Sequence, residues 1–204
     1  MSNDVLRVHS ESAQTYDQIC LQVESHAHEV LFGMAFEYIN PKEALIDIGI
    51  GTGVCSKLFH KAGLKIYGVD NSQEMLAVCR KKGFATELKK HDLCSGNWPF
   101  EAQAFHHAIC CGVFHFIPDL IVFFQETRRV LKDKGTFSFT LIDGKGKTSY
   151  VDSGIHIYCH DENAILPLAS GCGFSLLKRL PFSTFKDPRK QETVHFKAYT
   201  LRKT

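Results

Sequence analysis

No run of 18 apolar residues occurs in this 204-residue sequence, and its first 14 residues, MSNDVLRVHSESAQ, contain no apolar signal core. We therefore expect neither a membrane span nor a secretory signal, and we expect a cytoplasmic protein. The eight cysteines form no CxxC pair, and the close histidine clusters match no standard zinc spacing. We thus expect free thiols instead of a disulfide framework, and no bound metal.

A strong excess of one charge is also missing. Lys and Arg together number 24 and Asp and Glu number 22, which leaves a net charge of +2. A chain balanced in this way is not expected to bind polyanions in general, and nucleic acid is not the partner we expect. The basic run at residues 80–82 is interpreted as a solvated helix end.

Short apolar segments alternate with helical patterns through the middle of the chain. The predicted strands cover residues 44–48, 65–69, 84–90, 106–111 and 136–142, and the predicted helices between them cover 54–62, 73–82 and 121–131. This alternation predicts an α/β fold, with a doubly wound, mostly parallel sheet and helices on both faces. Two late strands, at 174–182 and 194–202, predict an antiparallel pair at one edge, giving seven strands.

The two flanks of this region carry weaker patterns. Residues 16–38 are predicted to form one helix, and residues 1–14 are predicted to be loosely held. A further helix is predicted at 161–170.

A glycine-rich loop follows the first predicted strand in the segment LIDIGIGTG. A phosphate-binding P-loop needs Gly-Lys-Ser/Thr, which is absent. The dinucleotide fingerprint GxGxxG fails as well, because Gly53 comes one residue early. Asp47 adds a carboxylate that would repel a pyrophosphate and suits a cationic ligand. S-adenosylmethionine carries an ammonium, a sulfonium and a carboxylate but no phosphate, so it fits this loop better.

Two further acidic residues stand at the ends of the next strands. Asp70 can accept hydrogen bonds from both hydroxyls of a ribose, a device shared by several nucleoside cofactors. Asp92 could accept a hydrogen bond from the amino group of adenine while Leu93 packs on the adenine ring. Alternatively, Asp92 could simply cap a loop. Together with Asp47, these positions predict a nucleoside ligand without a pyrophosphate.

At this point five segments resemble class I S-adenosylmethionine-dependent methyltransferases of the compact small-molecule type, in order and spacing: LIDIGIGTG, YGVDNSQEMLAVCRKKG, KHDLCSGNWPF, AFHHAICCGVFHFIPD and VLKDKGTFSFTLI. The resemblance implies a Rossmann-like sheet, S-adenosylmethionine as cofactor and S-adenosylhomocysteine as product. It implies one domain over 1–204, with an N-terminal helical segment (1–43), a cofactor-binding core (44–142), and an acceptor-side lid with C-terminal strands (143–204).

The resemblance also implies roles for individual residues. The cofactor-binding set is Asp47, Gly49, Gly51 and Gly53 at the methionine end, Asp70 at the ribose, Asn71 and Met75 along the adenosine, Asp92 and Leu93 at the adenine, Cys111 beneath the methionine part, and Tyr16 closing over the cofactor. One departure is His106, where the family often has Asp. Because it lies at a strand start, away from the ligand edge, we interpret it as a structural change.

His115, in GVFHFIPD, is the candidate catalytic residue, since the family often has a histidine there facing the acceptor and the usual pKa of histidine suits a base. The alternative is a histidine that packs or orients the loop. His156, Tyr158 and His160 are weaker candidates for acceptor contacts, together with Tyr150.

The acceptor itself is inferred by elimination. The Asn-Pro-Pro-Tyr tetrapeptide of nitrogen methyltransferases is missing, as is an added basic RNA-binding module. These absences favour a small-molecule acceptor methylated by in-line displacement. Three alternatives stay open: a protein or RNA methyltransferase working with a partner chain, a non-catalytic S-adenosylmethionine-binding protein, and a nicotinamide-dependent oxidoreductase.

Overall fold

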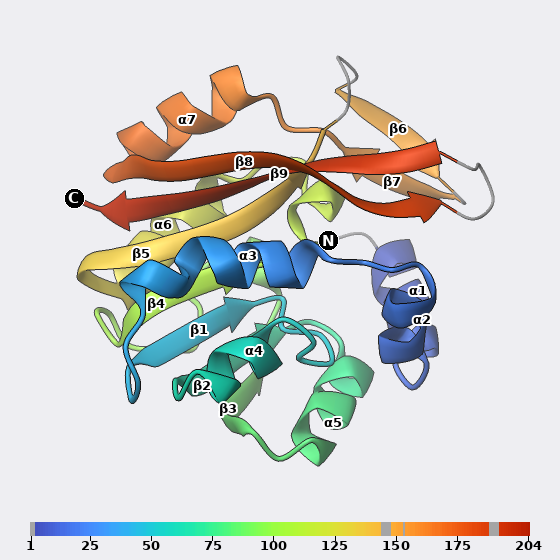
Figure 1. The fold of residues 1–204 in the computed structure, drawn as a ribbon, viewed down its shortest axis with the longest axis horizontal. Helices are drawn as coiled ribbons and strands as arrows, with labels where there is room; N and C mark the ends of the chain where they lie inside the picture. Colours follow the sequence, from blue (N-terminus) through green and yellow to red (C-terminus); the bar gives the residue numbers. More distant parts are fainter. Residues whose placement is uncertain (1–2, 144–147, 153, 188–191) are drawn as a thin grey trace.

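A seven-stranded sheet in the order β3-β2-β1-β4-β5-β9-β8 organises the molecule (Figure 1). This computed structural model describes residues 3–143, 148–152, 154–187 and 192–204. The strands are β1 (Ala44–Ile48), β2 (Lys65–Asp70), β3 (Ala85–Lys90), β4 (Phe105–Cys110), β5 (Leu131–Ile142), β8 (Phe174–Asp187) and β9 (Glu192–Lys203). The first five run parallel, whereas β9 is antiparallel to β5 and to β8. The predicted doubly wound sheet with an antiparallel edge pair is therefore confirmed.

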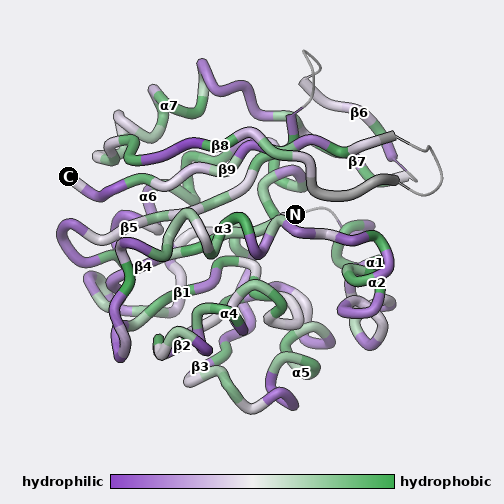
Figure 2. The backbone as a smooth tube through the Cα atoms, in the orientation of Figure 1, coloured by the Kyte–Doolittle hydropathy of each residue, from purple (hydrophilic) through white to green (hydrophobic). Residues whose placement is uncertain are grey.

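Helices cover both faces of this sheet, because its central strands are apolar on both sides. One face carries α3 (Ala27–Ala35), α4 (Ser56–Lys61) and α5 (Gln73–Lys81), whose buried Leu31, Phe59 and Leu76 share one core. The other face carries α6 (Ile121–Val130) and α7 (Glu162–Gly171), with Phe123 and Ile165 in a second core. Figure 2 shows the hydrophobic middle of α3 lying against the sheet.

The N-terminal flank departs from the sequence prediction. Residues 16–38 do not form one helix: they form α2 (Tyr16–Gln22), α3 and the short 3-10 helix η1 (Phe36–Tyr38). The break contains Glu24, whose backbone φ of 51° is left-handed and cannot continue a helix. Residues 3–14 are not loosely held either, because α1 (Asn3–Ser12) buries Val5 to 1% exposure; residues 1 and 2 lie outside the described residues.

A small hairpin was also missed. β6 (Ser149–Asp152) and β7 (Ile155–Tyr158) pair antiparallel, apart from the main sheet. Its strands have only four residues each, too short for a clear alternation of apolar and polar residues. Two further 3-10 helices, η2 (Leu93–Ser95) and η3 (Phe114–Phe116), follow β3 and β4. Among the described helices, none has the length and hydropathy needed to cross a bilayer.

His106 lies at the start of β4, as predicted. Its Nδ1 accepts a hydrogen bond from the backbone N–H of Ala44, the first residue of β1, at 3.1 Å. The side chain thus ties two strand starts together. Parallel strands place their carboxyl ends at the opposite edge, where ligands bind in such folds.

Candidate functional site

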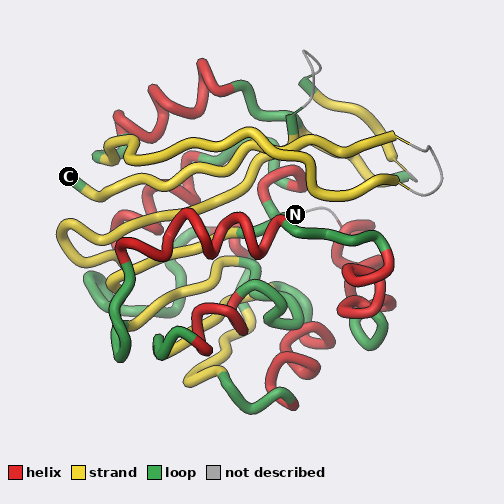
Figure 3. The backbone as a smooth tube through the Cα atoms, viewed as in Figure 1, coloured by secondary structure: helices red, strands yellow, loops and turns green. Residues whose placement is uncertain are grey.

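A cavity of about 320 Å³ lies at the carboxyl ends of β1, β2 and β4. Figure 3 shows the short helices α1 and α2 standing at this end of the sheet. The lining combines strand-end residues with N-terminal residues, among them His9, Tyr16, Cys20, His28, Asp47, Gly49, Gly51, Cys55, Asp70, Ser72, Met75, Cys111, His115, Phe116 and Phe196. Segments far apart in the sequence therefore share one cavity.

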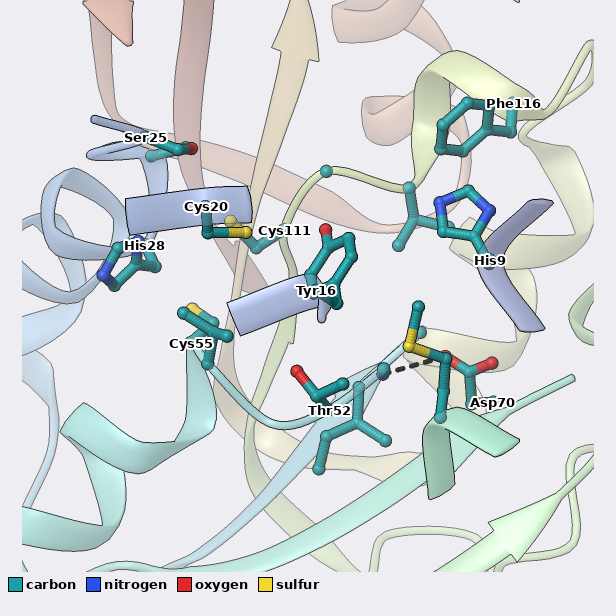
Figure 4. Close-up of a pocket in the computed structure, with 18 of the residues that line it drawn as sticks. His9, Tyr16, Cys20, Ser25, His28, Thr52, Cys55, Asp70, Cys111 and Phe116 are labelled. Atoms are coloured by element: carbon teal, nitrogen blue, oxygen red, sulfur yellow. Dashed lines mark hydrogen bonds between the residues drawn. The ribbon is translucent and has the colours of Figure 1, made fainter. Parts of the chain in front are cut away.

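Asp70 ends β2 and is held by backbone N–H groups. Gly51 N donates to its Oδ2 at 2.8 Å and Ser72 N donates to its Oδ1 at 2.8 Å (Figure 4). Burial raises the pKa of Asp70, while these two hydrogen bonds act in the opposite direction. Ser72 also caps α5, as its Oγ accepts from Met75 N at 3.2 Å. The carboxylate is thus fixed in direction at the cavity wall.

The glycines of the loop after β1 have different surroundings. Gly51, at φ 54°, has no heavy atom within 4 Å of where a Cβ would stand, so its backbone is open to the cavity. A Cβ on Gly49 would lie 2.4 Å from Val113 Cγ2. Gly53 does not line the cavity, and a Cβ there would lie 2.6 Å from Phe84 Cζ. Close ligand approach is therefore possible at Gly51, while Gly53 is packed against the protein.

Asp47 is a buried acid in β1, with 2% of its surface exposed. Ser56 Oγ donates to its Oδ2 at 2.6 Å. Burial raises the pKa of this carboxyl to about 7, and the charge of Asp70 adds to the rise. No lysine or arginine is found among the described residues that line the cavity. A cation bound beside Asp47 would therefore restore its ionised form.

The N-terminal helices are tied to the strand-end loops by polar contacts. Asp17 Oδ1 accepts a hydrogen bond from Thr52 Oγ1 at 2.6 Å, and its Oδ2 pairs with Lys82. The hydroxyls of Ser10 and Ser72 lie 3.0 Å apart. These contacts explain why α1 and α2 are ordered over the cavity.

Thiols and a tyrosine form one wall of the cavity (Figure 4). The Tyr16 hydroxyl is hydrogen-bonded to Cys20, and burial raises the pKa values of both groups. Cys55 is hydrogen-bonded to Cys111, and this contact together with burial raises the pKa of Cys55 well above its usual range. The thiols of Cys20 and Cys55 therefore stay protonated, so this wall adds no negative charge. None of the eight cysteines, all of which lie among the described residues, forms a disulfide.

His115, in η3, lies in an aromatic surrounding. Its ring centroid is 4.0 Å from that of Phe116 and 6.1 Å from that of Phe196. Burial lowers the pKa of His115 to about 3, and its buried Nδ1 has no hydrogen-bond partner among the described residues. A histidine with this pKa is neutral and only weakly basic, which disfavours a general base. The assignment of His115 as the catalytic residue stays a prediction.

Several candidates from the sequence do not line this cavity. Asp92, at the end of β3, caps η2, with Oδ1 accepting from Cys94 N at 3.1 Å. Leu93 is buried at 1% exposure, and its carbonyl accepts from Trp98 Nε1 at 3.1 Å. Asn71 is likewise not part of the lining. Their assignment to the adenosine stays a prediction.

The weaker acceptor candidates make internal contacts. His160 Nε2 lies 3.1 Å from Phe114 O and 2.9 Å from Ile117 O, so it orients the loop that carries His115. His156 and Tyr158 stack on one another in β7, with ring centroids 4.6 Å apart.

Sequence reasoning missed several lining residues: His9, Cys20, His28 and Phe196. The pattern of α1 offered a local signal for the first, since an amphipathic helix with buried Val5 has one side facing the protein. Phe196 offered none, because it reaches the cavity from the far end of the chain.

Comparisons with known proteins agree with this geometry. A family model described as a methyltransferase domain matches residues 46–139. The biotin biosynthesis bifunctional protein BioHC of Saccharophagus degradans is 26% identical over 141 residues, which cover 68% of this chain and 24% of that protein. A ubiquinone biosynthesis O-methyltransferase of Actinobacillus pleuropneumoniae is 25% identical, covering 54% of this chain and 53% of that protein. The match thus spans about half the length of the ubiquinone biosynthesis O-methyltransferase and about a quarter of the length of BioHC.

A solved structure supports the fold over almost the whole chain. The 1,6-didemethyltoxoflavin-N1-methyltransferase of Burkholderia thailandensis, crystallised with its substrate and S-adenosylhomocysteine, has a TM-score of 0.74. It is 17% identical, and the match covers 97% of this chain and 87% of that one.

The fold and the strand-end cavity define an α/β protein with a candidate ligand site at the carboxyl ends of its parallel strands. The matching domain model over residues 46–139 and the shared fold make the chain similar to the class I S-adenosylmethionine-dependent methyltransferase superfamily. S-adenosylmethionine is the cofactor of that superfamily, in agreement with the prediction from the glycine loop.

Proposed function

We propose that this protein is an S-adenosylmethionine-dependent methyltransferase that acts on a small, uncharged and largely apolar acceptor. The observation that carries the proposal is the cavity itself, where Asp47, Asp70 and the open backbone of Gly51 meet at one sheet edge. The relatives named for ubiquinone and biotin biosynthesis support a small-molecule acceptor.

The polar side of the cavity suits the donor. Asp47 would hold the ammonium of the methionine part, which turns a destabilised buried carboxyl into an ion pair. Asp70, fixed by Gly51 N and Ser72 N, keeps lone pairs with which it can accept a hydrogen bond from the ribose. Gly49 and Cys111 would lie along the methionine part and Met75 along the adenosine, while Tyr16 would cover the cofactor. Gly53, Asn71, Asp92 and Leu93 stay in the proposed set from the resemblance.

The apolar part of the lining suits an uncharged acceptor. It includes Ile19, Val23, Phe116 and Phe196, and the last two lie against the ring of His115. The neutral His115 offers one polar atom there, and burial of a charged acceptor without a counter-ion would be costly. A non-catalytic binding protein would be expected to have this side filled by its own side chains, so the open lining favours an enzyme.

Methyl transfer from a sulfonium is an in-line displacement with a neutral leaving group, so positioning supplies much of the rate. In this scheme His115 aligns the acceptor through a hydrogen bond and does not remove a proton before attack. An acceptor that must lose a proton would release it to another group or to water.

Titration calorimetry with S-adenosylhomocysteine tests the donor half of the proposal. We expect micromolar binding to the protein and no binding of NADH, which fluorescence measures in parallel. Binding of NADH with no S-adenosylhomocysteine binding would overturn the proposal in favour of an oxidoreductase. A methyl-donor assay over a panel of quinols, phenols and heteroaromatic amines, read by formation of S-adenosylhomocysteine, tests the acceptor half.

A further inference from the structure

His9 is a cavity residue to which no role has been given. It comes from α1 and lies between Phe116 and Asp70, opposite Tyr16 (Figure 4). Its ring meets that of Phe116 edge-on, with centroids 5.1 Å apart. His9 is the one histidine of α1. The contact between the hydroxyls of Ser10 and Ser72 holds this helix in place beside the cavity.

One ring nitrogen of His9 is already committed. Nδ1 lies 2.8 Å from the carbonyl oxygen of Val5, which can only accept a hydrogen bond. Nδ1 therefore carries a hydrogen, and in the neutral ring Nε2 holds a lone pair. Among the described residues, Nε2 has no hydrogen-bond partner, and it is not enclosed by the protein. The ring thus offers an oriented hydrogen-bond acceptor to a ligand in the cavity.

His9 is within electrostatic reach of both halves of the site. A positive charge on its ring would lower the pKa of Asp70 and also that of His115. The ring therefore stands where the proposed ribose position meets the proposed acceptor position.

A ribose bound at Asp70 presents two neighbouring hydroxyl donors. Each oxygen of Asp70 already accepts one backbone N–H, at 2.8 Å in both cases. We propose that His9 is a donor-binding residue whose Nε2 accepts a hydrogen bond from one ribose hydroxyl while Asp70 accepts from the other. This inference rests on the proposed use of S-adenosylmethionine. It means that α1 contributes directly to recognition of the sugar.

A purely structural role makes the opposite prediction. The bond from Nδ1 to Val5 O could simply stabilise α1, with no part for Nε2. Asparagine at this position keeps a polar atom near Nδ1 and loses the one near Nε2, whereas glutamine does the reverse. The variants His9→Asn and His9→Gln therefore separate the two roles.

The test is titration calorimetry of both variants with S-adenosylhomocysteine and with its 2′-deoxy and 3′-deoxy analogues. We expect His9→Asn to bind S-adenosylhomocysteine about threefold to tenfold more weakly than the parent protein, as for loss of one hydrogen bond, and His9→Gln to bind within about twofold. One deoxy analogue should lose affinity for the parent protein but not for His9→Asn. His26→Asn and His26→Gln, on an exposed histidine outside the cavity, serve as matched controls.

The possible results separate the two proposals. Equal binding by all variants, or weaker binding by His9→Gln alone, overturns the role of His9 and leaves the proposed function standing. No binding of S-adenosylhomocysteine to the parent protein overturns the proposed function itself. Thermal unfolding of each variant shows whether α1 and the rest of the fold remain intact.

Discussion

Two partly buried polar clusters lie at opposite ends of the parallel strands and differ in how their charges are compensated. At the strand starts, His107 Nε2 lies 2.9 Å from Glu43 Oε2, and its Nδ1 lies 2.7 Å from Thr136 Oγ1. Glu43 also accepts from Asn40 N at 2.7 Å. At the strand ends, Asp47 has one hydroxyl as its partner and lies near the like charge of Asp70.

The pKa values follow this difference. Burial would raise the pKa of Glu43, but hydrogen bonds from His107 and Asn40 outweigh it and lower the pKa. For Asp47 burial dominates, and the pKa rises to about 7. The first cluster, Glu43-His107-Thr136, is complete within the protein and serves the fold. The second, Asp47-Asp70, is left incomplete, which is what a site for a cationic ligand requires.

The largest expected effect falls on ligand binding at the Asp47-Asp70 cluster. Replacing Asp70 by Asn removes the charged acceptor of the proposed ribose contact, so S-adenosylhomocysteine should bind about 100-fold more weakly. Titration calorimetry measures the change in affinity for S-adenosylhomocysteine. The control variant Glu43→Gln, at the starts of the strands, should leave this affinity unchanged. If both variants bind like the parent protein, the division of roles between the two edges is wrong.

The Glu43-His107-Thr136 cluster should respond in stability instead. Glu43→Ala leaves the buried His107 Nε2 without its acceptor, and we expect a loss of about 2 kcal/mol in the free energy of unfolding. Because the folded-state pKa of Glu43 is lowered, its contribution is present at neutral pH and is lost as the pH falls through that pKa. Urea unfolding at pH 7 and pH 4 should show the difference between variant and parent shrinking in acid.

The sheet and part of the site could be predicted from the sequence because their signals are local. The apolar runs and glycine spacing around residues 44–70 already fix strand, turn and next strand. Asp47 and Asp70 followed from their places at strand ends. The start of β5 could not be predicted. The strand begins at Leu131, where the sequence pattern predicts the end of a helix, and not at residue 136.

The rest of the cavity wall could not be predicted because its structure depends on contacts between distant parts of the chain. The break between α2 and α3 rests on one left-handed residue, Glu24, with no glycine to signal it. His9 and Phe196 reach the cavity from the two ends of the chain. The low pKa of His115 likewise comes from burial among rings that only the folded chain brings together.

Removing the charge at Asp47 should separate stability from binding. The folded-state pKa of about 7 lies above the usual value of a carboxyl, so ionisation of Asp47 in the unfolded chain disfavours the folded state increasingly from about pH 4 to pH 7, and by a constant amount above pH 7. We expect Asp47→Asn to raise the free energy of unfolding by about 1 to 2 kcal/mol at pH 8, with the gain fading as the pH falls from about 7 to about 4. Binding of S-adenosylhomocysteine should weaken at least tenfold. A variant less stable than the parent at pH 8 would contradict the assignment.

The smallest expected effect distinguishes the two histidines near η3. His115 has a buried Nδ1 without a partner, whereas His160 bonds two carbonyls, Phe114 O and Ile117 O. At pH 7.5, His115→Leu should change the free energy of unfolding by less than about 1 kcal/mol, whereas His160→Leu should lower it by about 1 to 2 kcal/mol.

The pH dependence of stability gives a second test of His115. Because the folded-state pKa of His115 is lowered to about 3, the unfolded chain takes up the proton at a higher pH than the folded protein does. The parent protein should therefore lose stability relative to His115→Leu as the pH falls from 7 to 5. Thermal unfolding at both pH values measures this. A pH-independent difference would mean that the ring of His115 is solvated and charged in acid, which would remove the reason for treating it as the neutral polar group of the acceptor side.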